Sequence, residues 1–211
     1  MLSKREVGCV CEIGVVQMRQ PIGRLDTSPH VGAHTTSPVL GLPIPEFAKN
    51  QHGQTADFVV LVNEAIQNEC REQRQMVFLV DVTTPSKPFS VANFQVPEAS
   101  GNFCARGGRF GAHASNESFT SIYYRRLVFI SYFNAGVRAV DIRDPYRPQE
   151  VAFYIPAITE KTDKRCVPVT GGSEACKVAI QTNNVEVDDH GYIYIVDRAN
   201  TGMHILELNA R

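Results

Sequence analysis

The amino-acid sequence predicts an all-β fold built from four-stranded antiparallel units, and three observations support this prediction. Residues 79–88 and 139–148 share the pattern Asp-x-x-x-Pro-x-x-Pro. Apolar, β-branched stretches precede and follow both blocks, as is typical of strands buried in stacked sheets. The tripeptide Gly-Ala-His stands upstream of each block, at 32–34 and 111–113. Repeats of this kind are the signature of a β-propeller, in which each unit is one blade around a central channel.

Each repeated unit has a definite order of strands and turns. The aspartate at the end of a strand accepts hydrogen bonds from the following turn, and the two prolines end that strand and start an outer one. We expect one blade at 32–97 and a second at 98–156. The predicted strands occupy 57–62, 76–82 and 89–96 in the first blade, and 126–133, 137–142 and 150–155 in the second. An inner strand near the histidine of Gly-Ala-His completes each blade.

Residues 157–211 are expected to form a loop and an incomplete last blade. Its predicted strands cover 185–187, 192–196 and 202–208, and no fourth strand follows them. Residues 1–31 are expected to form an N-terminal strand and linker, because 5–13 resembles the outer strand near 149–155. Three blades cannot close a ring, since known rings hold roughly 4–8. We therefore expect either a homodimer with a six-bladed ring or the missing remainder of a longer propeller.

A β-sandwich and an irregular barrel are the alternative folds, but neither needs the repeated Asp-x-x-x-Pro-x-x-Pro. The best helical candidate is residues 63–75, as a short insertion. Two stretches, 40–55 and 157–179, are predicted to be long loops. Long loops inside a compact domain tend to be functional or disordered, so both stretches are of interest beyond the fold.

One part of the sequence resembles a known family. The segment 127–145 reads Leu-Val-Phe-Ile-Ser-Tyr-Phe-Asn-Ala-Gly-Val-Arg-Ala-Val-Asp-Ile-Arg-Asp-Pro and resembles the repeat of the bacterial LVIVD-repeat proteins. The segments 107–113 and 187–194 are similar to stretches that flank this repeat, and the likeness covers roughly 28–208. The resemblance implies a β-propeller, commonly exported or surface-associated and mostly without an assigned activity. Family members tend to carry a second histidine shortly after Gly-x-His, where this chain has Asn116.

His34 and His113 are the candidate metal ligands. Each is expected to open the innermost strand of a blade, so that both converge on the channel. Neutral imidazole is a common ligand of transition metals, and a carboxylate such as Glu117 would complete a site for a divalent metal ion. The alternative is structural, with each histidine bonded to backbone groups between blades.

Arg109 and Asn184 are the candidate ligand-binding residues at the mouth of the channel. A guanidinium in this place binds a carboxylate or phosphate bidentately, although it also serves to bridge blades through backbone carbonyls. Asn183-Asn184 takes the place of the histidine in the third unit, so the inner strands do not form a ring of histidines.

The six cysteines fall into three pairs. Two pairs are candidates for disulfides, Cys70 with Cys104 and Cys166 with Cys176. Cys9 and Cys11 lie two residues apart, which places them on one face of a strand. Buried free thiols are the alternative for all of them. The even count favours an extracytoplasmic location, periplasmic or at the cell surface, as the family resemblance does, although no signal peptide is visible.

The net charge and the motifs that are missing exclude several classes of function. The chain has 21 Lys+Arg against 22 Asp+Glu, which excludes a strongly basic nucleic-acid binder, and no apolar run approaches the roughly 20 residues of a membrane span. Nucleophile elbows, phosphate-binding loops and His-Glu-x-x-His are missing from the sequence. We therefore expect a binding or interaction scaffold. The alternative is a metal-dependent enzyme, a hydrolase, lactonase or oxidase, with its site around His34 and His113.

Overall fold

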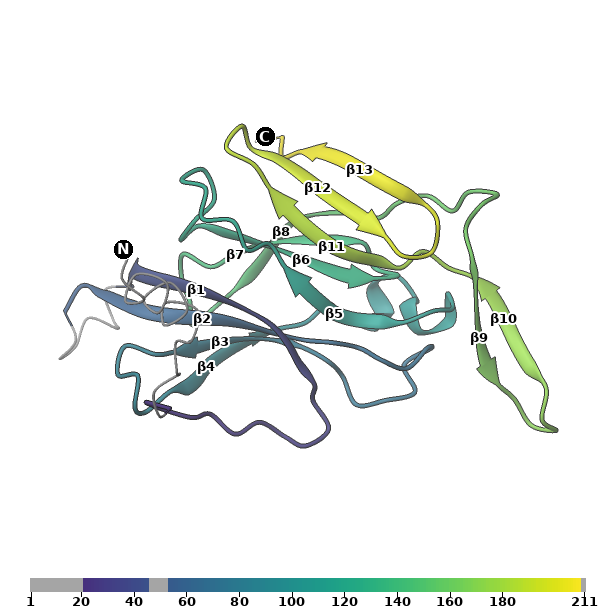
Figure 1. The fold of residues 1–211 in the computed structure, drawn as a ribbon, viewed down its shortest axis with the longest axis horizontal. Helices are drawn as coiled ribbons and strands as arrows, with labels where there is room; N and C mark the ends of the chain where they lie inside the picture. Colours follow the sequence, from purple (N-terminus) through teal and green to yellow (C-terminus); the bar gives the residue numbers. More distant parts are fainter. Residues whose placement is uncertain (1–20, 46–52, 210–211) are drawn as a thin grey trace, which may run out of the picture.

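The computed structural model describes residues 21–45 and 53–209 and shows an all-β protein of antiparallel sheets, which confirms the predicted fold class (Figure 1). The strand expected at 5–13, with Cys9 and Cys11, lies outside the described residues. Two short 3-10 helices, η2 (Glu98–Ser100) and η3 (Phe103–Ala105), are the helical elements of the described part. In that part, no helix has the length and apolar character needed to cross a membrane.

Blade 1 is a four-stranded sheet in the order β1-β2-β3-β4. Its strands are β1 (Ala33–Pro43), β2 (Thr55–Asn63), β3 (Val77–Asp81) and β4 (Phe89–Phe94). Burial along β2 alternates at its start and becomes continuous toward its end. This change is expected for a strand whose first half meets solvent on one face and whose second half lies between neighbouring sheets.

Blade 2 repeats the same arrangement. Its strands are β5 (Phe110–Ser115), β6 (Leu127–Phe133), β7 (Val137–Asp141) and β8 (Gln149–Tyr154). A register shift lies between Leu79 and Val80 on β3, and another lies at the matching position between Ala139 and Val140 on β7. The two blades therefore share their strand order and also a local irregularity in strand pairing.

Blade 3 has three strands within the described residues, as the sequence predicted. These are β11 (Thr182–Val187), β12 (Tyr192–Asp197) and β13 (Gly202–Glu207). A single pair, Thr182 with Phe133, joins β11 to β6 of blade 2. In Figure 1, blade 3 lies on the opposite side of blade 2 from blade 1, and β13 forms its outer edge.

The turns follow the expected chemistry. The Thr83 N–H donates to Asp81 Oδ1 at 2.8 Å, and the Arg143 N–H donates to Asp141 Oδ1 at 2.9 Å. Each aspartate thus closes the turn that carries the chain to the outer strand. Gly136 ends the β6–β7 hairpin with φ of 76°, a left-handed conformation that suits glycine.

Two hydrophobic cores hold neighbouring blades together. Phe58 of blade 1 and Ile130 and Tyr132 of β6 belong to one core, whereas Phe129 of β6 and Ile195 of β12 belong to the other. Alternate residues of a strand point to opposite faces, so β6 serves both cores. Each blade is therefore buried against its neighbours, and blade 2 lies between the other two.

Three local predictions need correction. Residues 63–75 are not a helix, because the Ile66 and Gln67 N–H groups donate to Glu72 Oε1, at 2.6 and 2.7 Å, instead of to helical carbonyls. The stretch 40–55 is partly strand, since β1 continues to Pro43.

The second predicted loop, 157–179, contains a hairpin of β9 (Lys164–Pro168) and β10 (Glu174–Val178), which projects from the molecule in Figure 1. Cys166 pairs with Cys176 across it as a disulfide. Cys70 and Cys104 form the second disulfide, so both expected pairs are present and these four thiols are not free. Two disulfides point to an oxidising, extracytoplasmic environment.

Candidate functional site

The inner strands of the blades bring the candidate residues together. β5 contacts β1 on one side and β11 on the other. His34 is the second residue of β1, His113 lies within β5, and Arg109 immediately precedes β5. Glu64 directly follows β2, whose last residues pair with the start of β1. Two neighbouring blades thus place a carboxylate beside two imidazoles.

The two histidines face the same carboxylate. His113 Nε2 lies 3.5 Å from Glu64 Oε1, and His34 Nε2 lies 3.9 Å from Glu64 Oε2. The two imidazole ring centroids are 4.4 Å apart. Each of the three residues offers a ligand atom, and these atoms all lie within 4.8 Å of one another.

Hydrogen bonds at the other ring nitrogens orient both imidazoles. His113 Nδ1 is 2.6 Å from the Asn183 carbonyl oxygen, which can only accept, so Nδ1 carries the proton. His34 Nδ1 is 2.8 Å from Thr35 Oγ1, a hydroxyl that can accept in the same way. In the neutral form of each ring with its proton on Nδ1, the unprotonated Nε2 faces Glu64. This is the orientation that a metal-ligating histidine adopts when its second nitrogen is held by an outer partner.

Burial favours the neutral form of His113. Desolvation lowers the pKa of this imidazole below its ordinary value, and the charge of His34 acts in the same direction. The hydrogen bond to the Asn183 carbonyl and the charge of Glu64 oppose the shift without reversing it. His113 therefore offers a free electron pair on Nε2 at neutral pH.

Two guanidinium groups approach the same carboxylate. Arg109 Nη1 is 3.0 Å and Arg198 Nη1 is 3.8 Å from Glu64 Oε1. Both guanidinium groups lie over the Phe133 ring, at 5.4 and 5.9 Å from its centroid, and His113 meets the same ring edge-on at 5.0 Å. Phe133 thus packs against the cluster, and the two arginines hold the Glu64 carboxylate in place.

Of the residues singled out from the sequence, the structure brings together His34, His113 and Arg109. Glu117 does not join them: it is exposed beyond the end of β5, where its N–H donates to Glu186, and Glu64 takes the carboxylate position. Asn184 accepts a hydrogen bond from Asn183 Nδ2 at 2.6 Å, and it is the Asn183 carbonyl that reaches His113.

Glu64 and Arg198 were not identified as site residues from the sequence. Strand pairing shows that the two occupy equivalent positions of the repeat. Phe58, Leu127 and Tyr192 occupy equivalent positions, because each pairs with the acidic residue that ends the next strand. Six residues further along each blade stand Glu64, Phe133 and Arg198. These three different side chains occupy one repeat position and meet in the site, so matching by residue type does not reveal them.

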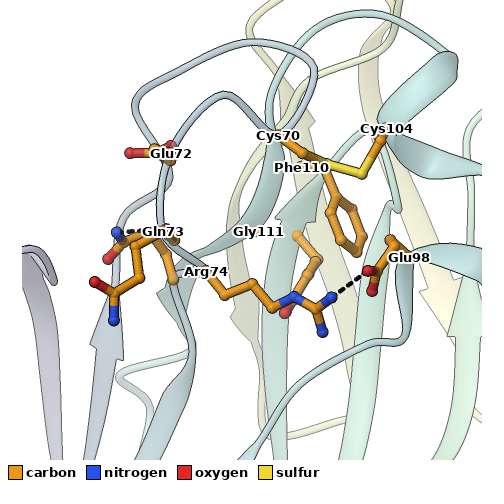
Figure 2. Close-up of a pocket in the computed structure, with 10 residues that line it drawn as sticks. Cys70, Glu72, Gln73, Arg74, Glu98, Cys104, Phe110 and Gly111 are labelled. Carbon is orange, nitrogen blue, oxygen red and sulfur yellow. Dashed lines mark hydrogen bonds and ion pairs between the residues drawn. A yellow bond between two sulfur atoms is a disulfide. The ribbon is translucent and has the colours of Figure 1, made fainter.

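A second concavity lies beside the Cys70–Cys104 disulfide (Figure 2). It has a volume of about 260 Å³, and none of the candidate site residues described above lines it. An ion pair between Arg74 and Glu98 crosses it in Figure 2, and the Tyr132 hydroxyl, which also lines it, accepts the Val96 N–H at 3.3 Å. These polar groups thus already have partners in the fold, and the His34–Glu64–His113 group remains the better candidate.

In the described part of the chain, one other group has ligand atoms close to each other, namely Cys166, Glu174 and Cys176. Its two sulfurs are joined in the disulfide, so neither is a thiolate that could bind a metal. No protein-family model matches the chain, and no curated protein matches it. The geometry of His34, Glu64 and His113 is therefore the main indication of function.

Proposed function

We propose that this protein is an extracytoplasmic binding module of the LVIVD-repeat type that holds a divalent transition metal between blades 1 and 2. His34, Glu64 and His113 would be the ligands. One observation carries the proposal: both histidines direct Nε2 to one carboxylate while their Nδ1 atoms are held by Asn183 and Thr35.

The donor set matches the chemistry of zinc. Two imidazole nitrogens and one carboxylate form a known zinc ligand set, with metal–ligand bonds of about 2.0–2.2 Å in tetrahedral geometry. Ligand atoms in such a site lie roughly 3.3 Å from one another. His113 Nε2 lies 3.5 Å from Oε1 of Glu64 and His34 Nε2 lies 3.9 Å from Oε2, so the side chains would have to draw closer together to bind one ion. Arg109 and Arg198 both approach Oε1, so a metal bound through Oε2 would leave these ion pairs in place.

Support for the LVIVD assignment and for the location is of a different kind. The segment 127–145 that resembles the repeat forms β6, its hairpin, β7 and the following turn. Two disulfides agree with a protein that acts outside the cytoplasm. Binding of a partner or ligand at the channel is the role that such a repeated scaffold supports best.

The second candidate function is a metal-dependent hydrolase or lactonase. Three protein ligands leave a coordination position free for water, as in catalytic zinc sites. Arg109 and Arg198 lie where a developing negative charge would need stabilisation. Hydrolysis of lactone or ester substrates by the zinc-loaded protein, lost in Glu64→Gln, would favour this alternative over the scaffold.

Isothermal titration of Zn²⁺ into protein purified without a polyhistidine tag tests the metal site. We expect one ion bound per chain, and at least tenfold weaker binding in His34→Ala and Glu64→Gln because each loses one of three ligands. His190→Ala is the matched control, since His190 is 81% exposed on the β11–β12 turn and outside the group. Equal binding by wild type and Glu64→Gln, or equal weakening in His190→Ala, would overturn the site. Thermal melts of each variant identify any loss that comes from unfolding.

A further inference from the structure

Blade 3 ends in an unusual edge. Within the described residues, β13 has no strand on its outer side, whereas β4 and β8 cover the equivalent strands of blades 1 and 2. Met203 and Ile205 of β13 are 60% and 57% exposed. A groove of about 370 Å³ runs between β13 and β8 and is lined mainly by apolar side chains. An open, apolar edge strand is a ready template for pairing with another strand.

The complete blades define how a fourth strand pairs at this position. In blade 2, Asp141 pairs with Gln149, and Ala139 pairs with Ala152 after the register shift. In blade 1, the equivalent pairs are Asp81 with Phe89 and Leu79 with Ala92, with the same shift. On β13 the positions that correspond to Asp141, Val140, Ala139 and Arg138 are Glu207, Leu206, Ile205 and His204.

We propose that residues 5–10 of a second copy of this chain add to β13 as the fourth strand of blade 3. The proposal rests on the propeller-type repeat and is independent of the metal. Arg5-Glu6-Val7-Gly8 corresponds to Gln149-Glu150-Val151-Ala152 of β8. Transfer of the blade 2 register pairs Arg5 with Glu207, Gly8 with Ile205 and Cys9 with His204.

Charge complementarity supports this register. Arg5 would lie opposite Glu207, so that opposite charges face each other across the strand pair. In blade 2, Glu150 accepts hydrogen bonds from Arg138 Nη1 at 3.2 and 3.4 Å. The residue equivalent to Arg138 is His204, whose buried Nε2 has no hydrogen-bond partner among the described residues. Glu6, at the place of Glu150, would supply that partner.

Topology indicates that the added strand comes from a second copy. The outer strand β4 leads to the inner strand β5 of the next blade, and β8 leads, after the β9–β10 hairpin, to the inner strand β11. A strand ahead of β1 therefore belongs to the blade that precedes blade 1. Within the described residues blade 2 separates blade 1 from blade 3, so in the proposed exchange the strand adds to the open edge of a partner. Reciprocal exchange between two chains would join two sets of the three described blades, and six blades are within the range of roughly 4–8 that closes a ring.

Cysteine cross-linking tests both the strand and its register. In His204→Cys, the new thiol would lie directly opposite Cys9 of the partner, at a separation that permits a disulfide. We expect a covalent dimer on non-reducing gels that disappears when Cys9→Ser is added. Ile205→Cys is the matched control, because residue 205 points to the opposite face and faces Gly8. Light scattering of the wild type should give a molecular mass of twice the 23.4 kDa of one chain.

Two results would overturn the proposal. A monomeric mass without cross-linking would show that the edge is not used by a second copy, and a dimer that cross-links equally through residues 204 and 205 would refute the register. Zinc titration of the same samples separates the two proposals. His34, Glu64 and His113 all belong to one chain, so a monomer that still binds zinc would leave the metal site standing.

Discussion

Tyr132 illustrates at the scale of a single residue how packing between blades controls side-chain chemistry. It is 2% exposed in the core between blades 1 and 2. Burial raises the pKa of its hydroxyl from 10.0 to about 12. Because the folded protein holds this proton more tightly than the unfolded chain, the neutral phenol contributes stability that is complete below about pH 10. That contribution is lost as the pH rises toward 12.

Tyr132→Phe tests this linkage. We expect the free energy of unfolding of the wild type to fall by up to about 3 kcal/mol more than that of the variant across this alkaline range, since two pKa units correspond to that amount. Urea unfolding at a series of pH values, with brief incubation to protect the disulfides, measures the difference. Parallel pH profiles for the two proteins would contradict it.

The candidate site shows which residues a sequence can and cannot reveal. His34 and His113 were predictable because the same tripeptide precedes both, and Arg109 because it lies beside one of them. Glu64 and Arg198 share a repeat position but differ in charge, so only the pairing register identifies them as equivalent. Glu117 does not lie with the two histidines, because it follows the end of β5, although its nearness in sequence to His113 favoured it as the carboxylate.

At the scale of elements, the β6–β7 hairpin depends on a glycine with no room for a side chain. A Cβ at Gly136 would lie 2.0 Å from the Tyr154 carbonyl oxygen. Gly171, at the tip of the β9–β10 hairpin, also has a positive φ, 92°, but a Cβ there would meet nothing within 4 Å. Substitution of Gly171 would therefore introduce backbone strain alone, whereas substitution of Gly136 would introduce backbone strain and steric overlap.

Gly171→Ala should lower the free energy of unfolding by about 1–2 kcal/mol, the strain of a left-handed non-glycine residue. Gly136→Ala should lower it by roughly 3 kcal/mol or more, because displacement of β8 is added to that strain. Chemical unfolding of both variants measures the two values. Equal losses would mean that β8 moves aside without cost.

The two disulfides should differ in how much each contributes to the free energy of unfolding. Cys70–Cys104 closes a loop with a sequence separation of 34, against 10 for Cys166–Cys176. In the chain-entropy account the longer loop contributes about 4 kcal/mol and the shorter about 3 kcal/mol. Double replacement of each pair by alanine, followed by thermal unfolding, should therefore destabilise the Cys70–Cys104 variant more. The reverse order would show that the β9–β10 hairpin contributes more than its loop length implies.

Strands were more predictable than the segments between them. Residues 127–145 carry their own pattern of β-branched residues, aspartate and proline, and these local features determine β6, β7 and their turns. Residues 63–75 contain helix-forming residue types, but their backbone groups bind Glu72 and Gly108 and the segment is tied by Cys70 to Cys104. The long-range partners among these, Gly108 and Cys104, override local preference, and a single sequence does not display them.

At the scale of the whole molecule, blade 2 contributes residues to both hydrophobic cores and blade 3 to one of them, within the described residues. If a partner strand covers β13, deletion of residues 1–13 should expose it. We expect faster amide hydrogen exchange along β13 in the deletion variant, with little change in β7, whose neighbours β6 and β8 remain. Exchange that is unchanged along β13 would mean that this edge is open in the full chain as well.

His34 belongs to blade 1 and His113 to blade 2, and this division has a thermodynamic consequence. An ion bound by both would stabilise only the docked arrangement of the two blades. At a free concentration one hundred times its dissociation constant it would add about 2.7 kcal/mol to that arrangement. The stability of the packing between blades 1 and 2 would then depend on metal supply, and a chelator would weaken that packing without touching the hydrophobic core that the two blades share.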